Sequence, residues 1–493
     1  MKKNYIKGIA VFALALLVTA CEDFLEKSPY DSVNTENFYE TEEDAVAAVN
    51  GAYQPLQWAK LYNMRMWTSD IMAGNSIVGA GGGDDGRETQ DMANFVTSPD
   101  NQGVLDLWRG PAPGILRCNT VLQRVPEMEI SKDLKNRVLG EARFLRGLYY
   151  FILVRYFGDV PLILEPQNPG DDLMIGRTDK SLVYEQIIKD LERAAEMLPR
   201  REVYGGADLG RASKGAAKGL LAKVHLTLGN WQKVVDLTDE VEKLGYKLNP
   251  EYADNFDVSK ENSVESLFEV QYVSNSGEDF WSNENQASWL SAFTGPRNSG
   301  MVAGGWGWNQ PTKEFVASYE KGDKRKDVTV LYEGCPEFDG QAYDKAYSST
   351  GYNLRKFLVT KAISATHDNS PKNFPVLRYS DVLLMKAEAL NNLNRTKEAY
   401  APLNKVRNRA GLENAPQAMS KKQFLKAVLK ERRMELAFEG QRWFDLTRVK
   451  NGEYGLEFLH GIGKLNAKQT HLLFPIPQKE IDANPNLTQN PGY

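Results

Sequence analysis

The clearest hydrophobic pattern in the chain lies in residues 376–410, on either side of polar Asn394 and Arg395. Apolar side chains recur there at steps of three and four, at Val376, Tyr379, Leu383, Ala387, Leu390, Ala399, Leu403, Val406 and Ala410. Such steps place one apolar stripe on each of two α-helices. Because Ala387 and Ala399 are small, the helices can approach closely across a short turn. The spacing predicts a helical hairpin of the tetratricopeptide type.

Similar but weaker stripes occur earlier, over residues 138–156, 184–198 and 212–243. A lone hairpin cannot bury both of its apolar faces, so the hairpins must stack on one another. They do not recur at a fixed period, and two stretches without helical periodicity, about 62–114 and 250–375, interrupt them. We therefore expect an all-α fold, in which tetratricopeptide-like hairpins form a scaffold and long irregular loop insertions carry the ligand face.

Aromatic and amide side chains gather in the second irregular stretch. Four of the nine tryptophans, Trp281, Trp289, Trp306 and Trp308, lie there without helical spacing, and Asn283 stands among them. Sugar rings stack on aromatic faces while their hydroxyls bond to amides, so this composition favours a carbohydrate ligand. Packing of the insertion onto the scaffold would also explain some of these residues.

The first irregular stretch contains Trp67, Asp70 and Asn75, followed by the glycine-rich run 79–86 and Arg87. The run lacks the G-x-x-x-x-G-K-[ST] spacing of a phosphate-binding loop, and its aspartates do not match a calcium loop. Long irregular segments in compact proteins are often functional. We therefore interpret residues 62–114 as a recognition loop, without a nucleotide or any other cofactor.

Charge and residue counts exclude several other classes of protein. The net charge of −5 gives no basic face for nucleic acid. The four histidines show no metal-ligand spacing, so we expect no metal site. Three cysteines are too few for a disulfide framework. Whether Cys118 and Cys335 pair is left open by the sequence.

A group of charged residues near the C-terminus invites a catalytic interpretation. Its members are Glu431, Glu435, Glu439, Arg432, Arg433 and Arg442. Two facing carboxylates would be needed for glycoside hydrolysis. Spacings of three and four on one helix instead predict an ion-pair lattice that ties helices together. We therefore expect no enzyme activity.

The N-terminus has the form of an export signal. Lys2, Lys3 and Lys7 precede an apolar run that ends at Ala20 and is too short for a membrane span of about 20 residues. The sequence Val-Thr-Ala-Cys at its end resembles the lipobox of bacterial lipoproteins. We expect residues 1–20 to be a signal peptide, Cys21 to carry lipid, and residues 21–35 to form an acidic tether. Thr41 with Asp44 predicts a capping box.

Several motifs together resemble the SusD/RagB family of Bacteroidetes outer-membrane lipoproteins. They are the lipobox at Cys21, QPTKEF with DKRKD, RYSDVLLMKAEALNNL, LNKVRNRAGL, ERRMELAFEGQRWFDLTR and the terminal FPIPQKEIDANPNLTQNPGY. The resemblance implies one α-helical domain over residues 36–493, no catalysis, and a SusC-like TonB-dependent transporter as partner. Glycan-binding members use aromatic residues from inserted loops, a region comparable to residues 280–308 with Trp67 and its polar neighbours.

The resulting hypothesis is a lipid-anchored outer-membrane protein that faces the cell exterior, binds oligo- or polysaccharide and delivers it to the transporter. Its expected ligand contacts are Trp67, Asp70, Asn75, Arg87, Trp281, Asn283, Trp289, Trp306 and Trp308. The alternative is a RagB-like protein that binds peptides, which would depend more on backbone hydrogen bonds. A glycoside hydrolase and an intracellular tetratricopeptide adaptor are disfavoured by the absence of a carboxylate pair and by the lipobox.

Overall fold

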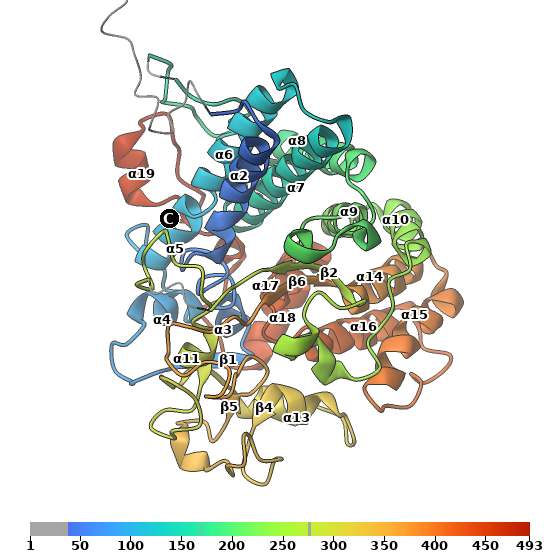
Figure 1. The fold of residues 1–493 in the computed structure, drawn as a ribbon. Coiled ribbons are helices and arrows are strands. Elements are labelled where there is room, and N and C mark those ends of the chain that lie inside the picture. Colours follow the sequence, from blue (N-terminus) through green and yellow to red (C-terminus); the bar gives the residue numbers. More distant parts are fainter. Residues whose placement is uncertain (1–37, 169, 275–277) are drawn as a thin grey trace, which may run out of the picture.

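Helices dominate the computed structural model, which describes residues 38–168, 170–274 and 278–493 (Figure 1). The longer ones are α2 (Glu42–Tyr53), α6 (Ala112–Arg124), α7 (Lys132–Phe157), α8 (Lys180–Met197), α9 (Lys214–Leu228), α10 (Trp231–Lys243), α14 (Tyr379–Asn392), α15 (Thr396–Arg409) and α16 (Lys421–Glu435). The expected signal peptide 1–20, the tether 21–35 and Cys21 lie outside the described residues. No helix among the described residues is long and apolar enough to cross a membrane.

Short helices and strands fill the connecting segments. The short helices are α3 (Ser69–Met72), α4 (Arg87–Ala93), α5 (Gln102–Arg109), α11 (Leu290–Thr294), α12 (Lys313–Ala317), α13 (Arg325–Thr329), α17 (Arg442–Arg448), α18 (Glu453–Gly461) and α19 (Gln478–Ala483). The strands are β1 (Ser76–Gly79), β2 (Ser266–Val270), β3 (Trp308–Pro311), β4 (Val330–Leu331), β5 (Asn353–Leu354) and β6 (Phe374–Arg378). They form antiparallel pairs, β1 with β3, β2 with β6 and β4 with β5.

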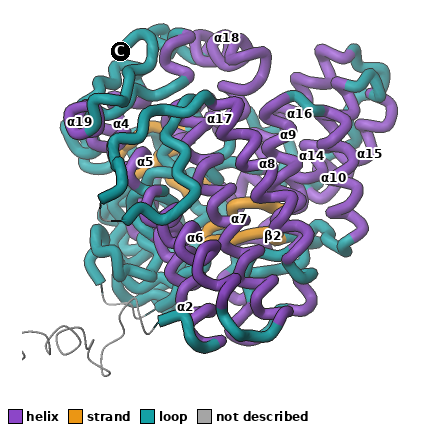
Figure 2. Tube along the Cα trace, turned by 90° about the horizontal axis from the view of Figure 1, so that it is seen from above, coloured by secondary structure: helices purple, strands orange, loops and turns teal. Residues whose placement is uncertain are grey.

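Consecutive helices pack in pairs, and the pairs form one continuous array. The closest partners are α7 with α8, α9 with α10, and α14 with α15. Helix α8 also contacts α9. Helix α10 contacts α14, although the 250–375 insertion separates the two helices in the sequence (Figures 1 and 2). Each pair thereby covers an apolar face of the next. The predicted scaffold of tetratricopeptide-like hairpins is confirmed.

Small residues and caps explain why these helices form and meet where they do. A Cβ atom at Gly147 of α7 would lie 3.1 Å from Leu191 of α8, so the glycine permits close packing. Ala387 and Ala399 are fully buried in the last hairpin, as expected. At the start of α2, the Thr41 hydroxyl accepts from the Asp44 amide at 3.1 Å, which confirms the capping box.

The structure corrects two element predictions. Residues 62–114 are not irregular throughout, because α4, α5 and the start of α6 lie within them. The Asn101 side chain caps α5 by accepting from the Val104 amide at 3.1 Å. Val376 does not begin the helical hairpin but lies in β6, and α14 begins at Tyr379. The 250–375 stretch is mostly loop, as predicted, and its gold segment with α13, β4 and β5 lies at the bottom of Figure 1, apart from α7 and α8.

The charged residues after Phe424 form the predicted ion-pair lattice in the interior. The Glu435 carboxylate pairs with Arg378 at 2.9 Å and with Arg325 at 3.2 Å, and it also meets Arg409. Burial alone would raise the pKa of Glu435, but the three guanidinium groups hold it well below its ordinary value. The lattice thus joins β6, α13, α15 and α16.

Other members of the group also serve the scaffold. Arg432 pairs with Asp381 at 2.6 Å and with Asp445 at 2.8 Å, so α16 is bonded to α14 and α17. Arg442 differs from the prediction, because its guanidinium lies over the Phe458 ring, 4.7 Å from the ring centre. The carboxylates of Glu435, Asp381 and Asp445 are thus bonded to arginine side chains that hold the elements together.

Candidate functional site

The inserted loops bring an unusual cluster of aromatic rings together. Trp289 immediately precedes α11, Phe293 lies within α11, Trp306 follows it and Trp308 begins β3. The Phe293 ring centre lies 4.8 Å from that of Trp306 and 5.7 Å from that of Trp308. Trp289 lies 5.9 Å from Trp306. Trp289, Trp306 and Trp308 therefore form one cluster around Phe293, and their expected contact with a ligand stays a prediction.

Only part of this cluster faces solvent. Trp281 is 56% exposed, Trp306 is half-buried, and His367 is exposed, whereas Trp289 and Trp308 are 7% and 5% exposed. The His367 ring centre lies 5.1 Å from that of Trp289 and 5.6 Å from that of Trp306. We call Trp281, Trp306 and His367 the aromatic platform. Trp289 lies beneath Trp306 and His367, whereas Trp281 packs on the buried Phe280, with ring centres 5.0 Å apart.

Trp67 lies in the interior and has no surface for a ligand. Its side chain is fully buried, and its indole nitrogen donates to the Asn63 carbonyl at 3.1 Å. The ring packs below Phe293 and Trp308, with centre distances of 6.1 and 6.5 Å. Contrary to the sequence expectation, Trp67 supports the cluster from behind, and the proposed set of ligand contacts no longer includes it.

Asp70 and Asn75 are also structural, because both side chains are completely buried. The Asp70 carboxylate accepts from the amides of Phe438 and Gly440 and from the Asn75 side chain at 2.8–3.2 Å. Asn75 in turn accepts from Arg433 at 2.8 Å. Burial raises the pKa of Asp70 to about 6, against the effect of these donors. This network fastens the first loop to the segment after α16.

Arg87 is exposed but already paired. Its guanidinium bonds to Asp84 at 3.1 Å and to Asp91 at 2.9 Å. The turn before it rests on the aromatic cluster, because a Cβ atom at Gly86 would lie 2.4 Å from the Trp308 ring. Arg87 thus lies on the surface of a loop that touches the cluster. A ligand that bonds to its guanidinium would also meet the carboxylates of Asp84 and Asp91.

Asn283 presents its side chain to solvent while its backbone is fixed. The Asn283 carbonyl accepts from the Gln54 side chain and from the Trp58 indole, both at 2.9 Å. The segment that carries Trp281 is thereby held against the N-terminal helical region. The Asn283 amide is exposed, and the contact with a ligand that the sequence predicted for it stays a prediction.

Three groups near the platform were not predicted from the sequence. His367 completes the aromatic surface, Arg65 places its guanidinium 5.9 Å from the Trp281 ring centre, and Arg297 donates to the Trp306 carbonyl at 3.2 Å. His367 lies in an irregular stretch with no motif around it, so no local signal indicated its position. Arg65 pairs with Asp106 at 2.7 Å and serves to hold the ring.

The arrangement has the chemistry of a ligand-binding surface. Flat aromatic faces next to amide and guanidinium groups can stack on, and bond to, a polyhydroxylated molecule. Among the described residues, no three His, Cys, Asp or Glu side chains gather as a metal ion would require.

Comparison with protein families identifies the class to which this fold and site belong. Residues 245–493 match the model described as the SusD family, and residues 23–226 match one described as starch-binding and associating with the outer membrane. The chain belongs to the SusD family. Its members are carbohydrate-binding proteins rather than enzymes, associated with the outer membrane.

Individual relatives cover the whole chain. SusD-like protein P2 of Formosa agariphila is 28% identical, and the alignment covers 100% of both chains. The structure of a laminarin-binding SusD-like protein superposes with a TM-score of 0.80 at 31% identity, covering 92% of this chain and 100% of that one. Surface glycan-binding protein A from Bacteroides thetaiotaomicron, in complex with laminarihexaose, has a TM-score of 0.78 at 26% identity, with 91% and 99% covered.

Proposed function

We propose that this protein binds an oligo- or polysaccharide on the aromatic platform and delivers it to a SusC-like TonB-dependent transporter in the outer membrane. The observation that carries the proposal is the solvent-facing surface of Trp281, Trp306 and His367, which rests on buried aromatic rings. Exposed apolar side chains that gather in a patch mark binding sites, and Trp281, at 56% exposure, belongs to such an aromatic group.

Stacking explains why the platform suits sugar. The C–H face of a pyranose ring is apolar and covers an indole, while its hydroxyls point to the rim. The Arg297 guanidinium beside Trp306 is a donor for these hydroxyls, and the exposed Asn283, two residues after Trp281, is expected to supply a donor and an acceptor. The buried rings beneath keep the platform rings in place, so little conformational entropy is lost when a glycan binds.

The relatives suggest which glycan to test first. Two of the similar structures are named for laminarin or contain laminarihexaose, and one matched family model is described as starch-binding. Laminarin is therefore the first candidate ligand and starch the second. Sequence identities near 30% leave the loops free to differ, so the proposal commits to a glycan and ranks these two.

The membrane-linked part of the proposal rests on the N-terminal sequence. We propose that residues 1–20 are removed, that Cys21 is acylated, and that residues 21–35 link the anchor to the folded domain on the cell exterior. Acyl chains stabilise membrane attachment by about 0.8 kcal/mol per buried methylene, so two or more chains anchor firmly. In a Bacteroidetes host, Cys21→Ala should release the protein from the membrane fraction, whereas Cys118→Ala should not.

The function is tested by titrating the chain from residue 22 onward with laminarin, starch and other polysaccharides, and with a pool of peptides, in a calorimeter. We expect heat with one class of glycan, and chromatography of the glycan afterwards should show no shortened product. Heat with peptides alone would replace the glycan by a peptide ligand. Shortened product would contradict the assignment as a binding protein.

A further inference from the structure

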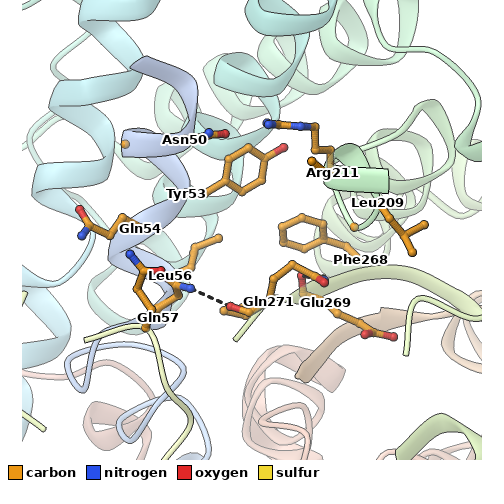
Figure 3. Close-up of a pocket in the computed structure, with 15 residues that line it drawn as sticks. Asn50, Tyr53, Gln54, Leu56, Gln57, Leu209, Arg211, Phe268, Glu269 and Gln271 are labelled. Carbon is orange, nitrogen blue, oxygen red and sulfur yellow. Dashed lines mark hydrogen bonds between the residues drawn. The ribbon is translucent and has the colours of Figure 1, made fainter. Parts of the chain in front are cut away.

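A cavity of about 500 Å³ lies between α2 and the β2 strand (Figure 3). In Figure 3, Tyr53 and Phe268 lie next to each other, Arg211 lies above them, and Gln54 and Gln57 lie on the left. No residue of the aromatic platform lines this cavity. Its volume falls within the range of small-molecule sites, about 300–1,000 Å³.

Carboxamides dominate the polar lining of the cavity. They belong to Asn50, Gln54, Gln57, Gln271 and Gln286. Among the described residues, the side chains of Asn50 and Gln286 make no polar contact, and both are exposed at the rim. An amide both donates and accepts hydrogen bonds, as a sugar hydroxyl does. The two rim amides are therefore available to a hydroxylated ligand.

The charged groups of the lining already have partners within the protein. Arg211 bonds to Glu141 at 3.0 Å and to Asp208 at 2.6 Å. The Glu269 carboxylate accepts from the Asn262 amide at 3.2 Å and from the Asn373 side chain at 3.1 Å. Because both charged groups already have partners, neither is free to pair with an ionic ligand. An ionic ligand would lose its hydration without compensation.

An extended peptide is also a poor fit, although β2 has a second edge. Strand β2 pairs with β6 on one edge only. On the other edge, the Gln271 carbonyl accepts from the Gln57 side chain at 2.8 Å, and the Glu269 carbonyl accepts from the Gln271 side chain at 3.0 Å. These amides occupy the positions that the N–H groups of an added strand would need.

We propose that this cavity is a second binding site, which takes one or two uncharged sugar rings independently of the aromatic platform. The half-buried Tyr53 ring supplies the apolar surface that a sugar face needs, and the buried Phe268 ring, with its centre 6.4 Å away, supports it. Asn50 and Gln286 bond to its hydroxyls. A glycan held at both sites would be bound at two points, which raises its overall affinity.

The test begins with the platform removed. The Trp281→Ala/Trp306→Ala protein is mixed with maltose, laminaribiose and cellobiose, and saturation transfer from protein to sugar is recorded by NMR. We expect a signal from at least one disaccharide. In the same background, Asn50→Ala/Gln286→Ala should weaken that signal about fivefold or more, because two hydrogen bonds are lost. Asn50→Arg should abolish it by placing a long side chain across the mouth.

The matched control is Asn414→Ala/Gln417→Ala, which removes two exposed amides of the same kinds from the segment between α15 and α16. It should leave the signal unchanged. Absence of any signal in the platform-free protein, or a signal that survives the Asn50 and Gln286 changes, would overturn the second site. If the aromatic platform did not bind glycan, the Trp281→Ala/Trp306→Ala protein would keep the glycan affinity of wild type, which is a separate outcome.

Discussion

At the scale of single residues, Trp281 and Trp67 show how one residue type takes two roles. Both tryptophans attracted attention in the sequence, but Trp281 is 56% exposed and Trp67 is fully buried. Trp281→Ala should leave the free energy of unfolding nearly unchanged and weaken glycan binding. Trp67→Ala should lower the free energy of unfolding by about 3–5 kcal/mol, because it opens a cavity in the core.

Chemical denaturation and calorimetry of the two variants separate these roles. Equal losses of stability in both would contradict the assignment of Trp281 to a ligand surface. Unchanged stability of Trp67→Ala would contradict its place beneath the cluster.

The ion pair between Glu320 and Arg407 makes the stability of the protein depend on pH. Its carboxylate accepts two hydrogen bonds from Arg407 at 3.0 Å, which lower its pKa from 4.5 to about 2. The folded pKa is below the unfolded one, so the stabilisation is complete above the unfolded value and is lost as pH falls from about 4.5 to 2. Glu320→Gln should therefore destabilise the protein at pH 6 and have progressively less effect toward pH 3.

The measurement is the difference in melting temperature between wild type and Glu320→Gln, which should become smaller as the pH falls from 6 to 3. Glu192→Gln is the matched control, because Glu192 is an exposed glutamate on α8 without an ion pair among the described residues. Its difference in melting temperature from wild type should stay the same across this pH range. A constant difference between wild type and Glu320→Gln across the pH range would contradict the account.

At the scale of elements, the sequence predicted the long helices and missed the short ones. Helices α9, α10, α14 and α15 carry their apolar stripes over several turns, so periodicity alone identifies them. Helix α5 is only two turns long, contains Gly103 and ends before Gly110, so its pattern was too short to distinguish from loop. Val376 was assigned to a helix because the residues of β6 are all buried and therefore lack the alternation of a half-buried strand.

The glycine-rich turn before α4 offers a matched pair of substitutions. Gly82 and Gly86 both have positive φ, +77° and +67°, which costs an alanine about 1–2 kcal/mol. A Cβ atom at Gly82 would meet nothing within 4 Å, whereas one at Gly86 would lie 2.4 Å from the Trp308 ring. Gly86→Ala should therefore lower the melting temperature more than Gly82→Ala and also weaken glycan binding. Equal effects would contradict the contact between this turn and the cluster.

At the scale of the whole molecule, the buried ion-pair lattice holds the hairpins and the insertion together. Glu435 meets Arg378 of β6, Arg409 of α15 and Arg325 of α13. Glu435→Ala should lower the free energy of unfolding by about 3–5 kcal/mol, since it leaves buried guanidinium groups without a partner. Equilibrium unfolding in urea measures the loss. A change below about 1 kcal/mol would show that the lattice contributes little to stability.

The candidate site could be predicted only in part, for a physical reason. The sequence identified the tryptophan cluster because its composition is unusual over a short stretch. Exposure depends on which loops cover each ring, and those loops come from distant parts of the chain, such as His367 above Trp289 and Gly86 against Trp308. Local sequence likewise left open whether Cys118 and Cys335 form a disulfide, and in the structure both are free and buried.

The central claim is that the aromatic platform binds the glycan. The most direct measurement is the affinity of wild type and of Trp281→Ala/Trp306→Ala for the polysaccharide that gives heat in the calorimetric panel. We expect the double variant to fold normally and to bind about tenfold or more weakly, since two stacking contacts are lost. Wild-type affinity in a folded double variant would contradict the claim and place the glycan elsewhere on the molecule.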